Sequence, residues 1–186
     1  MNTDATLLHT IYFYTVKITL LLLCINVAFC IFHRKKLNVP FQRLCYFLIW
    51  NLLTEIFAFV FMKLGYNNLP LLHIYTLGEF LLLSYFFKSL LTKPAFLRTA
   101  FWYFVFAGSF FIIINSIFFQ SIFGFNTFAK TFVQLTIIGY AILYFYNLVE
   151  NQSFSPLISK SLRLINSAIL VYYSGSLFIF MCSNVY

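Results

Sequence analysis

Two carboxylic acids, Glu55 and Glu79, lie near the middle of long apolar stretches, and they are two of only four acidic residues in the chain. A charged group is costly in hydrocarbon, so an ionisable residue inside an apolar span marks a functional site by default. Each carboxylate must pair with a cation or take up a proton, because an isolated buried charge is unstable. The two acids therefore predict a polar site inside an apolar protein.

Basic and amide side chains occur at similar depths in the other apolar stretches. We expect them to form an interior cluster, with Glu79 paired to Lys130 or Lys17. Glu55 is expected to bond to Asn51, one helical turn earlier, and to a neighbouring group. The candidate ligand-binding or polar-cluster residues are Asn51, Glu55, His73, Thr76, Glu79, Lys130, Gln134, Lys17 and Asn115.

Such a cluster has four interpretations. It can hold helices together and set their register, as polar side chains do in membrane proteins. It can instead line a ligand or signal pocket that opens outward. The other two interpretations are a path for ions or protons and a catalytic site.

No motif in the sequence specifies a reaction. His73 has no second histidine on a facing segment, because His9 and His33 lie elsewhere, and HExxH is absent. The run 173–176, Tyr-Ser-Gly-Ser, lacks the GxSxG pattern of a nucleophilic serine, and its small residues favour close helix approach instead. We therefore predict no catalytic residue, no metal site and no cofactor.

The four cysteines, Cys24, Cys30, Cys45 and Cys182, have no CxxC spacing and lie in or beside apolar segments. This pattern matches neither a zinc site nor a disulfide framework. We expect them to be free, buried thiols, which behave as small hydrophobic side chains.

The composition requires a lipid environment. Of the 186 residues, 62% are hydrophobic and 9% are charged, against about 25% charged in soluble domains. The net charge of +8 comes mostly from short loops that flank apolar segments. Basic residues in that position meet anionic lipid headgroups, so we expect the lipid bilayer as a partner and no nucleic acid.

Six stretches are long enough to cross a bilayer core, which needs about 20 residues of helix. Helix is expected because backbone groups find no water in lipid, and the alternation of a barrel is absent. We place the four prolines in loops and the spans unbroken, which disfavours a transporter. The fold class is an all-α polytopic transmembrane bundle, one domain over residues 1–186, with helices at about 11–32, 44–64, 71–91, 100–119, 128–148 and 162–182.

Lysine and arginine gather in every second break between these stretches. The positive-inside rule places those breaks in the cytoplasm, so both ends of a six-span chain lie outside. The predicted location is a bacterial inner (cytoplasmic) membrane. The residues that set this orientation are Arg34, Lys35, Lys36, Arg43, Lys88, Lys93, Arg98, Lys160 and Arg163.

Three stretches, 73–80, 115–120 and 166–184, together resemble a poorly characterised family of bacterial multi-helix inner-membrane proteins. Some members look like the membrane sensor region that precedes histidine kinases. The resemblance covers most of the chain from the second helix onward. It implies a helical membrane module, of seven helices when complete, and transfers no catalytic residue. Residues 1–186 depart from the sensor pattern in showing neither a seventh span nor a cytoplasmic output domain.

We therefore predict a non-enzymatic sensory or signal-relay module. Its outward-facing pocket around Glu55, His73, Glu79 and Lys130 would bind a small or lipid-like ligand or respond to pH. One alternative is a small intramembrane lipid-modifying enzyme that uses the glutamates and His73 as acid and base. Another is a structural or channel-forming subunit. A homo-oligomer, a protein partner and a downstream signalling domain all stay open.

Overall fold

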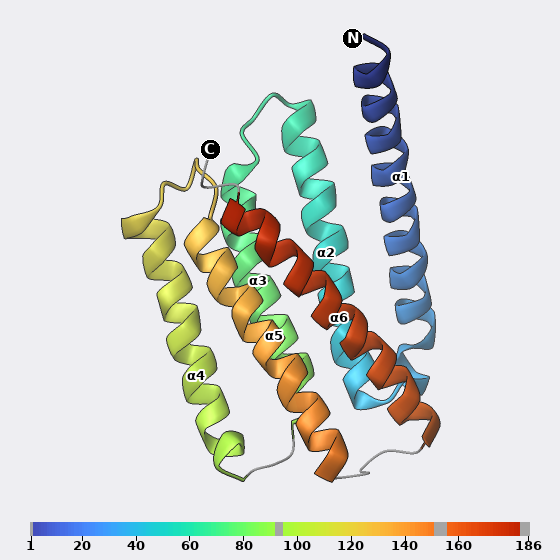
Figure 1. Cartoon of the computed structure of the whole chain (residues 1–186), viewed down its shortest axis with the longest axis vertical. Coiled ribbons are helices and arrows are strands. Elements are labelled where there is room, and N and C mark those ends of the chain that lie inside the picture. Colours follow the sequence, from blue (N-terminus) through green and yellow to red (C-terminus); the bar gives the residue numbers. More distant parts are fainter. Residues whose placement is uncertain (1, 92–94, 151–155, 183–186) are drawn as a thin grey trace.

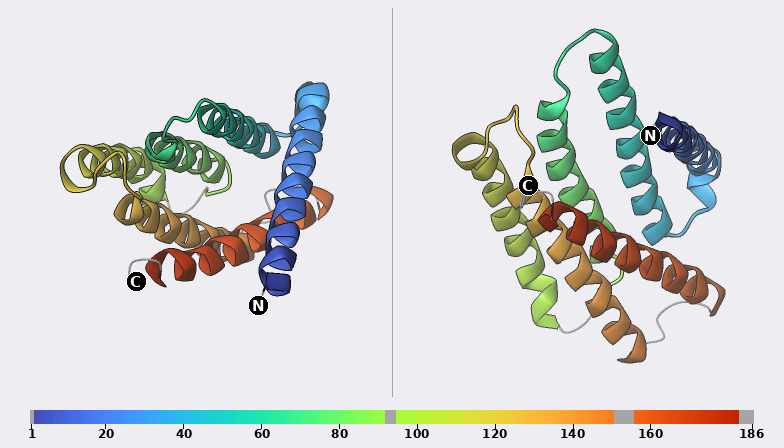
Figure 2. Two further views of the ribbon diagram at one scale, coloured as in Figure 1. Left: turned by 90° about the horizontal axis from the view of Figure 1, so that it is seen from above. Right: turned by 45° about the horizontal axis from the view of Figure 1, so that its top comes forward.

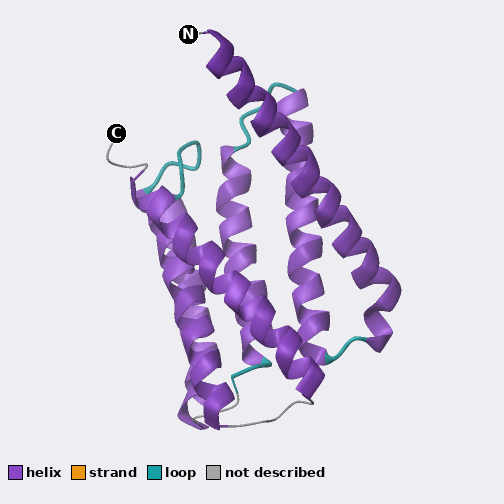
Figure 3. Cartoon of the chain, turned by 45° about the vertical axis from the view of Figure 1, so that its right-hand side comes forward, coloured by secondary structure: helices purple, strands orange, loops and turns teal. Residues whose placement is uncertain are grey.

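The computed structural model describes residues 2–91, 95–150 and 156–182, and within these ranges the chain is helical with no strand (Figure 3). The predicted all-α class is confirmed. The elements are α1 (Asn2–His33), the short 3₁₀ helix η1 (Arg34–Lys36), α2 (Val39–Lys63), α3 (Leu69–Lys88), α4 (Ala95–Ile114), the π-helical segment η2 (Asn115–Phe119), α5 (Thr127–Glu150) and α6 (Pro156–Cys182).

Helices α2 to α5 run side by side, and α6 crosses one face of this group obliquely (Figure 1). Helix α1 meets α2 near η1 and diverges from it toward its own N-terminal end, as the view from above also shows (Figure 2). The main helix pairs are α2 with α3, α5 with α6, and α3 with both α4 and α5. Helix α3 is therefore the centre of the bundle, whereas α1 lies at its edge.

Five of the helices are long and apolar enough to cross a membrane, which is compatible with a multi-pass integral membrane protein. The spans within them are Tyr14–Lys36, Val39–Lys63, Leu69–Lys88, Thr99–Phe119 and Thr127–Val149. Helix α6, predicted as a sixth span, is not among them. Its first turns carry Lys160 and Arg163, which lower its apolar character.

The loop assignment of the prolines is wrong at three positions. Pro40 and Pro70 lie in the first turns of α2 and α3, and Pro156 begins α6. Proline suits a first turn because its missing N–H has no partner there in any helix. Pro94 lies outside the described residues.

The predicted unbroken helix over 100–119 also needs correction. Its last residues, from Asn115, form a π-helical turn in which the Gln120 amide donates to the Asn115 carbonyl at 2.9 Å. A π turn shifts the direction of the side chains that follow and often occurs at functional sites. Here it turns Asn115 inward, where its side chain is 2% exposed.

The packed core lies between α3, α4, α5 and α6. Phe80, Leu83, Phe86 and Phe87 of α3 are fully buried at its centre. In lipid there is little hydrophobic drive between helices, so close packing and polar contacts hold them together. Most large apolar side chains of α1 and α2 are instead exposed, as expected for helices that face lipid chains.

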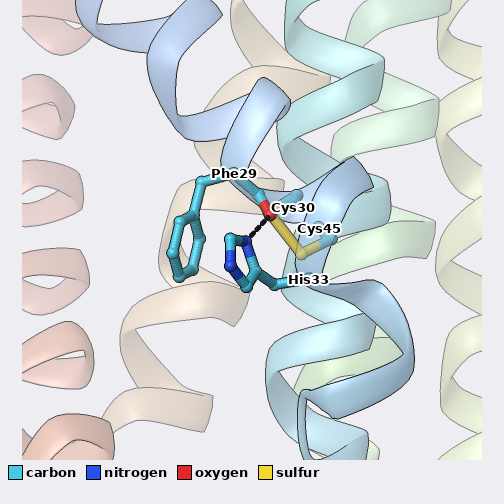
Figure 4. The surroundings of a disulfide bond; sticks show 4 residues. All are labelled: Phe29, Cys30, His33 and Cys45. Atoms are coloured by element: carbon cyan, nitrogen blue, oxygen red, sulfur yellow. Dashed lines mark hydrogen bonds between the residues drawn. A yellow bond between two sulfur atoms is a disulfide. The ribbon is translucent and has the colours of Figure 1, made fainter.

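The prediction of four free thiols is wrong for one pair. Cys30 of α1 and Cys45 of α2 form a disulfide with a Cα–Cα distance of 5.6 Å (Figure 4). The sequence separation of 15 residues bridges the η1 turn, so folding this turn brings the two sulfurs together. Cys24 is free, but it is exposed rather than buried. The side chain of Cys182 lies outside the described residues.

Candidate functional site

Glu79 of α3 is the centre of a buried polar cluster. Its carboxylate is 1% exposed and accepts three contacts. Lys130 of α5 lies 2.5 Å from Oε2. The hydroxyls of Tyr75 and Tyr173 donate to Oε1 at 3.1 and 2.7 Å. These contacts join α3, α5 and α6 at one point.

The Glu79–Lys130 pair is the first of the two pairings expected from the sequence. The Lys130 ammonium also lies 4.8 Å from the ring centroid of Tyr75, in a cation–π contact. With an ammonium and two phenol hydroxyls around it, the Glu79 carboxylate is satisfied as an anion. The pair acts as a bridge between α3 and α5.

His73 lies on α3, six residues before Glu79, but its hydrogen bonds are to other residues than the glutamates. Its Nδ1 lies 2.9 Å from the Ser116 hydroxyl, and its Nε2 lies 3.3 Å from the Gly124 carbonyl. Both ring nitrogens are thus engaged by α4's end and the following loop. The expected joint pocket of His73 with Glu55 and Glu79 is therefore not formed.

Asn115 lies in the same loop region as His73. Its side-chain amide donates to Gln120 at 2.9 Å and to Asn126 at 3.1 Å. The Gln120 oxygen also accepts the backbone amide of Phe128 at 3.2 Å. This network connects the π turn to the start of α5, and it accounts for Asn115 as a structural residue.

Two further candidates also make internal contacts. Thr76 is fully buried and donates to the Leu72 carbonyl of its own helix at 2.7 Å. Gln134 of α5 donates to the Ser176 hydroxyl of α6 at 2.9 Å. Asn166 of α6 adds a hydrogen bond of 3.0 Å to the Ala141 carbonyl. The hydrogen bonds of Gln134 and Asn166 hold α6 against α5.

A cavity of about 850 Å³ lies between the α2–α3 pair and α6. It exists because α6 packs on α5 while α2 packs on α3, so α2 and α6 face each other across a gap. Its walls are mostly apolar, and α1 contributes one edge. Its lining includes Leu44, Phe47, Asn51, Glu55, Tyr75, Lys130, Ala168, Ile169, Tyr172 and Tyr173.

Glu55 lines this cavity and is exposed to it. Across the described part of the chain, its carboxylate has neither a hydrogen bond nor a salt bridge. The expected bond to Asn51 is absent, although Asn51 lines the same cavity one turn away. Tyr75 of α3 and Tyr172 of α6 line the same cavity as Glu55.

Lys17 is exposed on α1 and is not a lining residue of the cavity. Glu79 pairs with Lys130 instead, so the alternative pairing with Lys17 is wrong. Six of the nine predicted candidates thus fall into three groups: the Glu79–Lys130 bridge, the His73 and Asn115 loop network, and the cavity wall with Glu55 and Asn51.

Sequence reasoning missed Tyr172 and Tyr173 of α6. Tyr173 is 3% exposed and completes the Glu79 cluster, whereas Tyr172 is 65% exposed on the cavity side. With 13 tyrosines in the chain, residue type alone does not single them out. Their adjacency to the Ser-Gly-Ser run, which allows α6 to approach its neighbours, was the available signal.

The lining of the cavity sets the chemistry that is available there. The cavity joins a carboxylate to aromatic and aliphatic walls, and no histidine, cysteine or serine nucleophile lines it. The described residues also contain no group of three metal-ligating side chains. Comparisons with protein-family models, with curated proteins and with solved structures find no match to this chain.

Proposed function

We propose that this protein is a membrane-embedded binding module that senses a lipid-like small molecule and relays its presence through helix movement. The observation that carries this proposal is the apolar-walled cavity of about 850 Å³ with the unpaired Glu55 carboxylate on its wall. Ligand sites are typically apolar cavities of roughly 300–1,000 Å³ with a few polar groups. Both the size and the lining suit an amphiphile.

The position of the cavity supports a relay. A ligand that binds between the α2–α3 pair and α6 contacts two parts of the bundle that have few other mutual contacts. It can shift their separation if it binds one arrangement more tightly than the other. The weak resemblance to membrane sensor regions agrees with this role, and a partner protein or domain would read the movement.

The enzyme alternative is less well supported. It requires His73 and a glutamate to face a common space as acid and base. The His73 ring is instead held by Ser116 and Gly124, and Glu79 is held by Lys130 and two tyrosines. Of His73, Glu55 and Glu79, Glu55 is the one that lines the cavity. A carboxylate without a partner acid or base beside it favours binding over catalysis.

The proposed topology has six spans, with α6 as an oblique sixth span and the basic end in the cytoplasm of a bacterial inner membrane. The beginning of α1 and the end of α6 lie at the same end of the bundle (Figure 1). The opposite end carries Arg34, Lys35 and Lys36, which favours the cytoplasm. The Cys30–Cys45 disulfide lies at this basic end and argues the other way, because cytoplasmic thiols are kept reduced.

A thiol-labelling experiment decides between these two signals. The orientation proposed from the charges requires Cys30 and Cys45 to be a dithiol in intact cells, whereas the structure joins them in a disulfide. Cells lysed directly into maleimide-polyethylene glycol should then show both residues labelled in a Cys24→Ser, Cys182→Ser background without added reductant. Labelling that requires prior reduction would place the disulfide in an oxidising compartment and reverse the orientation. Cys30→Ser is the control for labelling of a single site.

The binding proposal is tested by blocking the cavity. A dodecyl alcohol carrying a diazirine and an alkyne serves as a neutral photoaffinity probe. We expect saturable labelling of cavity-lining peptides in wild-type protein reconstituted in vesicles. Ala168→Trp should lower this labelling at least fivefold, because the indole fills space between α6 and α2.

The matched control is Val171→Trp on the same helix. Val171 is 73% exposed and is not a lining residue, so its replacement should leave cavity labelling unchanged. Equal labelling in all three proteins, or labelling spread evenly over lipid-facing helices, would show that the cavity does not bind the probe and would refute the proposal.

A further inference from the structure

The Glu55 carboxylate is the one group of the cavity whose charge lacks a counterpart. Glu55 lies 16 residues after the start of α2, or about 24 Å along the helix, and about 12 Å before its end at Lys63. This places Glu55 in the middle third of α2, where it is exposed on the cavity side among mostly apolar residues. An ionised carboxylate there needs a positive partner or a proton.

The neighbouring cation is already neutralised. Lys130 is the one lysine or arginine among the described lining residues, and its ammonium lies 2.5 Å from the Glu79 carboxylate. Glu79 and Lys130 thus cancel each other. The cavity and its bridge together carry one negative charge, from Glu55. A ligand with one positive charge would make the site neutral.

Aromatic rings stand beside this carboxylate on two walls. Tyr75 comes from α3 and Tyr172 from α6, and both line the same cavity as Glu55. The faces of aromatic rings attract cations, and the attraction is strongest where water is excluded. The hydroxyl of Tyr75 is occupied by Glu79 and its ring by the Lys130 ammonium, 4.8 Å from the ring centroid, so Tyr172 is the aromatic side chain left for a cationic ligand.

Apolar lining residues continue from Glu55 toward the basic end of the bundle. Leu44 and Phe47 lie earlier in α2 than Glu55, and Leu44 is about 16 Å from it along the helix. Ile169 faces the same space from α6. An amphiphile placed with its head at Glu55 would therefore have its chain between α2 and α6.

We propose that the ligand is an organic monocation with an apolar chain, such as a long-chain amine, whose charged head binds Glu55 on the cavity wall that Tyr172 faces. This inference rests on the proposed function and specifies the ligand's chemical class. An anionic amphiphile is disfavoured by the same charge, because its head would be repelled by Glu55 while Lys130 is held by Glu79.

Three dodecyl photoaffinity probes that differ only in their head test this assignment: an ammonium, an alcohol and a carboxylate. In wild-type protein in neutral vesicles, we expect the ammonium probe to half-saturate the cavity at a concentration at least tenfold below that of the alcohol. The carboxylate probe should label more weakly than the alcohol. Glu55→Gln should remove the preference for the ammonium, so that the ammonium and alcohol probes half-saturate this variant at similar concentrations.

The alcohol probe separates the possible failures. If the ammonium and alcohol label wild-type protein equally, the cation assignment is wrong while the binding module stands. If Glu55→Gln keeps the ammonium preference, the charge comes from elsewhere and Glu55 is not the binding group. If no probe labels the cavity, the proposed function itself fails. Saturable alcohol labelling of Glu55→Gln, of whatever strength, shows that the cavity of this variant is formed.

Discussion

Replacing Lys130 with methionine is expected to lower the free energy of unfolding by about 3 kcal/mol or more. The methionine keeps much of the side-chain volume but leaves the Glu79 carboxylate 1% exposed with no cation. The two tyrosine hydroxyls that also contact Glu79 cannot neutralise its charge. Reversible unfolding in mixed micelles with increasing dodecyl sulfate measures the loss.

A double variant separates the buried charge from the lost packing. Glu79→Gln with Lys130→Met removes both charges, and the glutamine oxygen can still accept from Tyr173. We expect this protein to recover most of the stability that Lys130→Met loses. Lys63→Met is the matched control, because Lys63 is exposed at the end of α2 over the ring of Phe59. A double variant as unstable as the single one would mean that charge burial is not the cause.

Replacing Gly78 with alanine is expected to destabilise the bundle by about 1–3 kcal/mol, the usual cost of overpacking. A Cβ atom at Gly78 would lie 2.3 Å from Cε2 of Trp50, so α2 and α3 would have to move apart. Since α2 and α3 form one wall of the cavity, labelling by the dodecyl alcohol probe should also fall. The same micelle unfolding assay and the photoaffinity assay provide the two measurements.

The chain contains a matched control for this glycine. Gly139 lies within α5, and a Cβ atom there would meet nothing within 4 Å. Gly139→Ala should therefore leave stability unchanged or raise it by about 0.5–1 kcal/mol, because alanine restricts the unfolded chain. Equal effects of the two substitutions would show that contact with Trp50 does not decide the outcome at Gly78.

The two mid-helix acids, Glu55 and Glu79, have different roles in this protein. Glu79 joins α3, α5 and α6, which supports the interpretation that the polar cluster holds helices together. Glu55 faces a cavity and supports the ligand-pocket interpretation. The sequence places both acids near mid-helix at similar depth, so their difference in role comes from what each one faces.

The sequence alone determined the helical class and the approximate positions of the helices. Apolar stretches of this length have one way to satisfy their backbone groups in lipid, and that is local hydrogen bonding within a helix. It also determined that Glu79 needs a cation, and Lys130 was one of two available. These are local or energetic requirements, which residue type and spacing express directly.

Only the tertiary structure decided which polar groups meet. Whether His73 contacts a glutamate or Ser116 depends on the rotation of α3 against α4 and on the π turn at Asn115. The Cys30–Cys45 pairing depends on how α1 meets α2 across η1. The cavity depends on α6 packing on α5 instead of α2. In lipid, most apolar faces are interchangeable, so hydrophobicity specifies that helices form but not which of their faces pair.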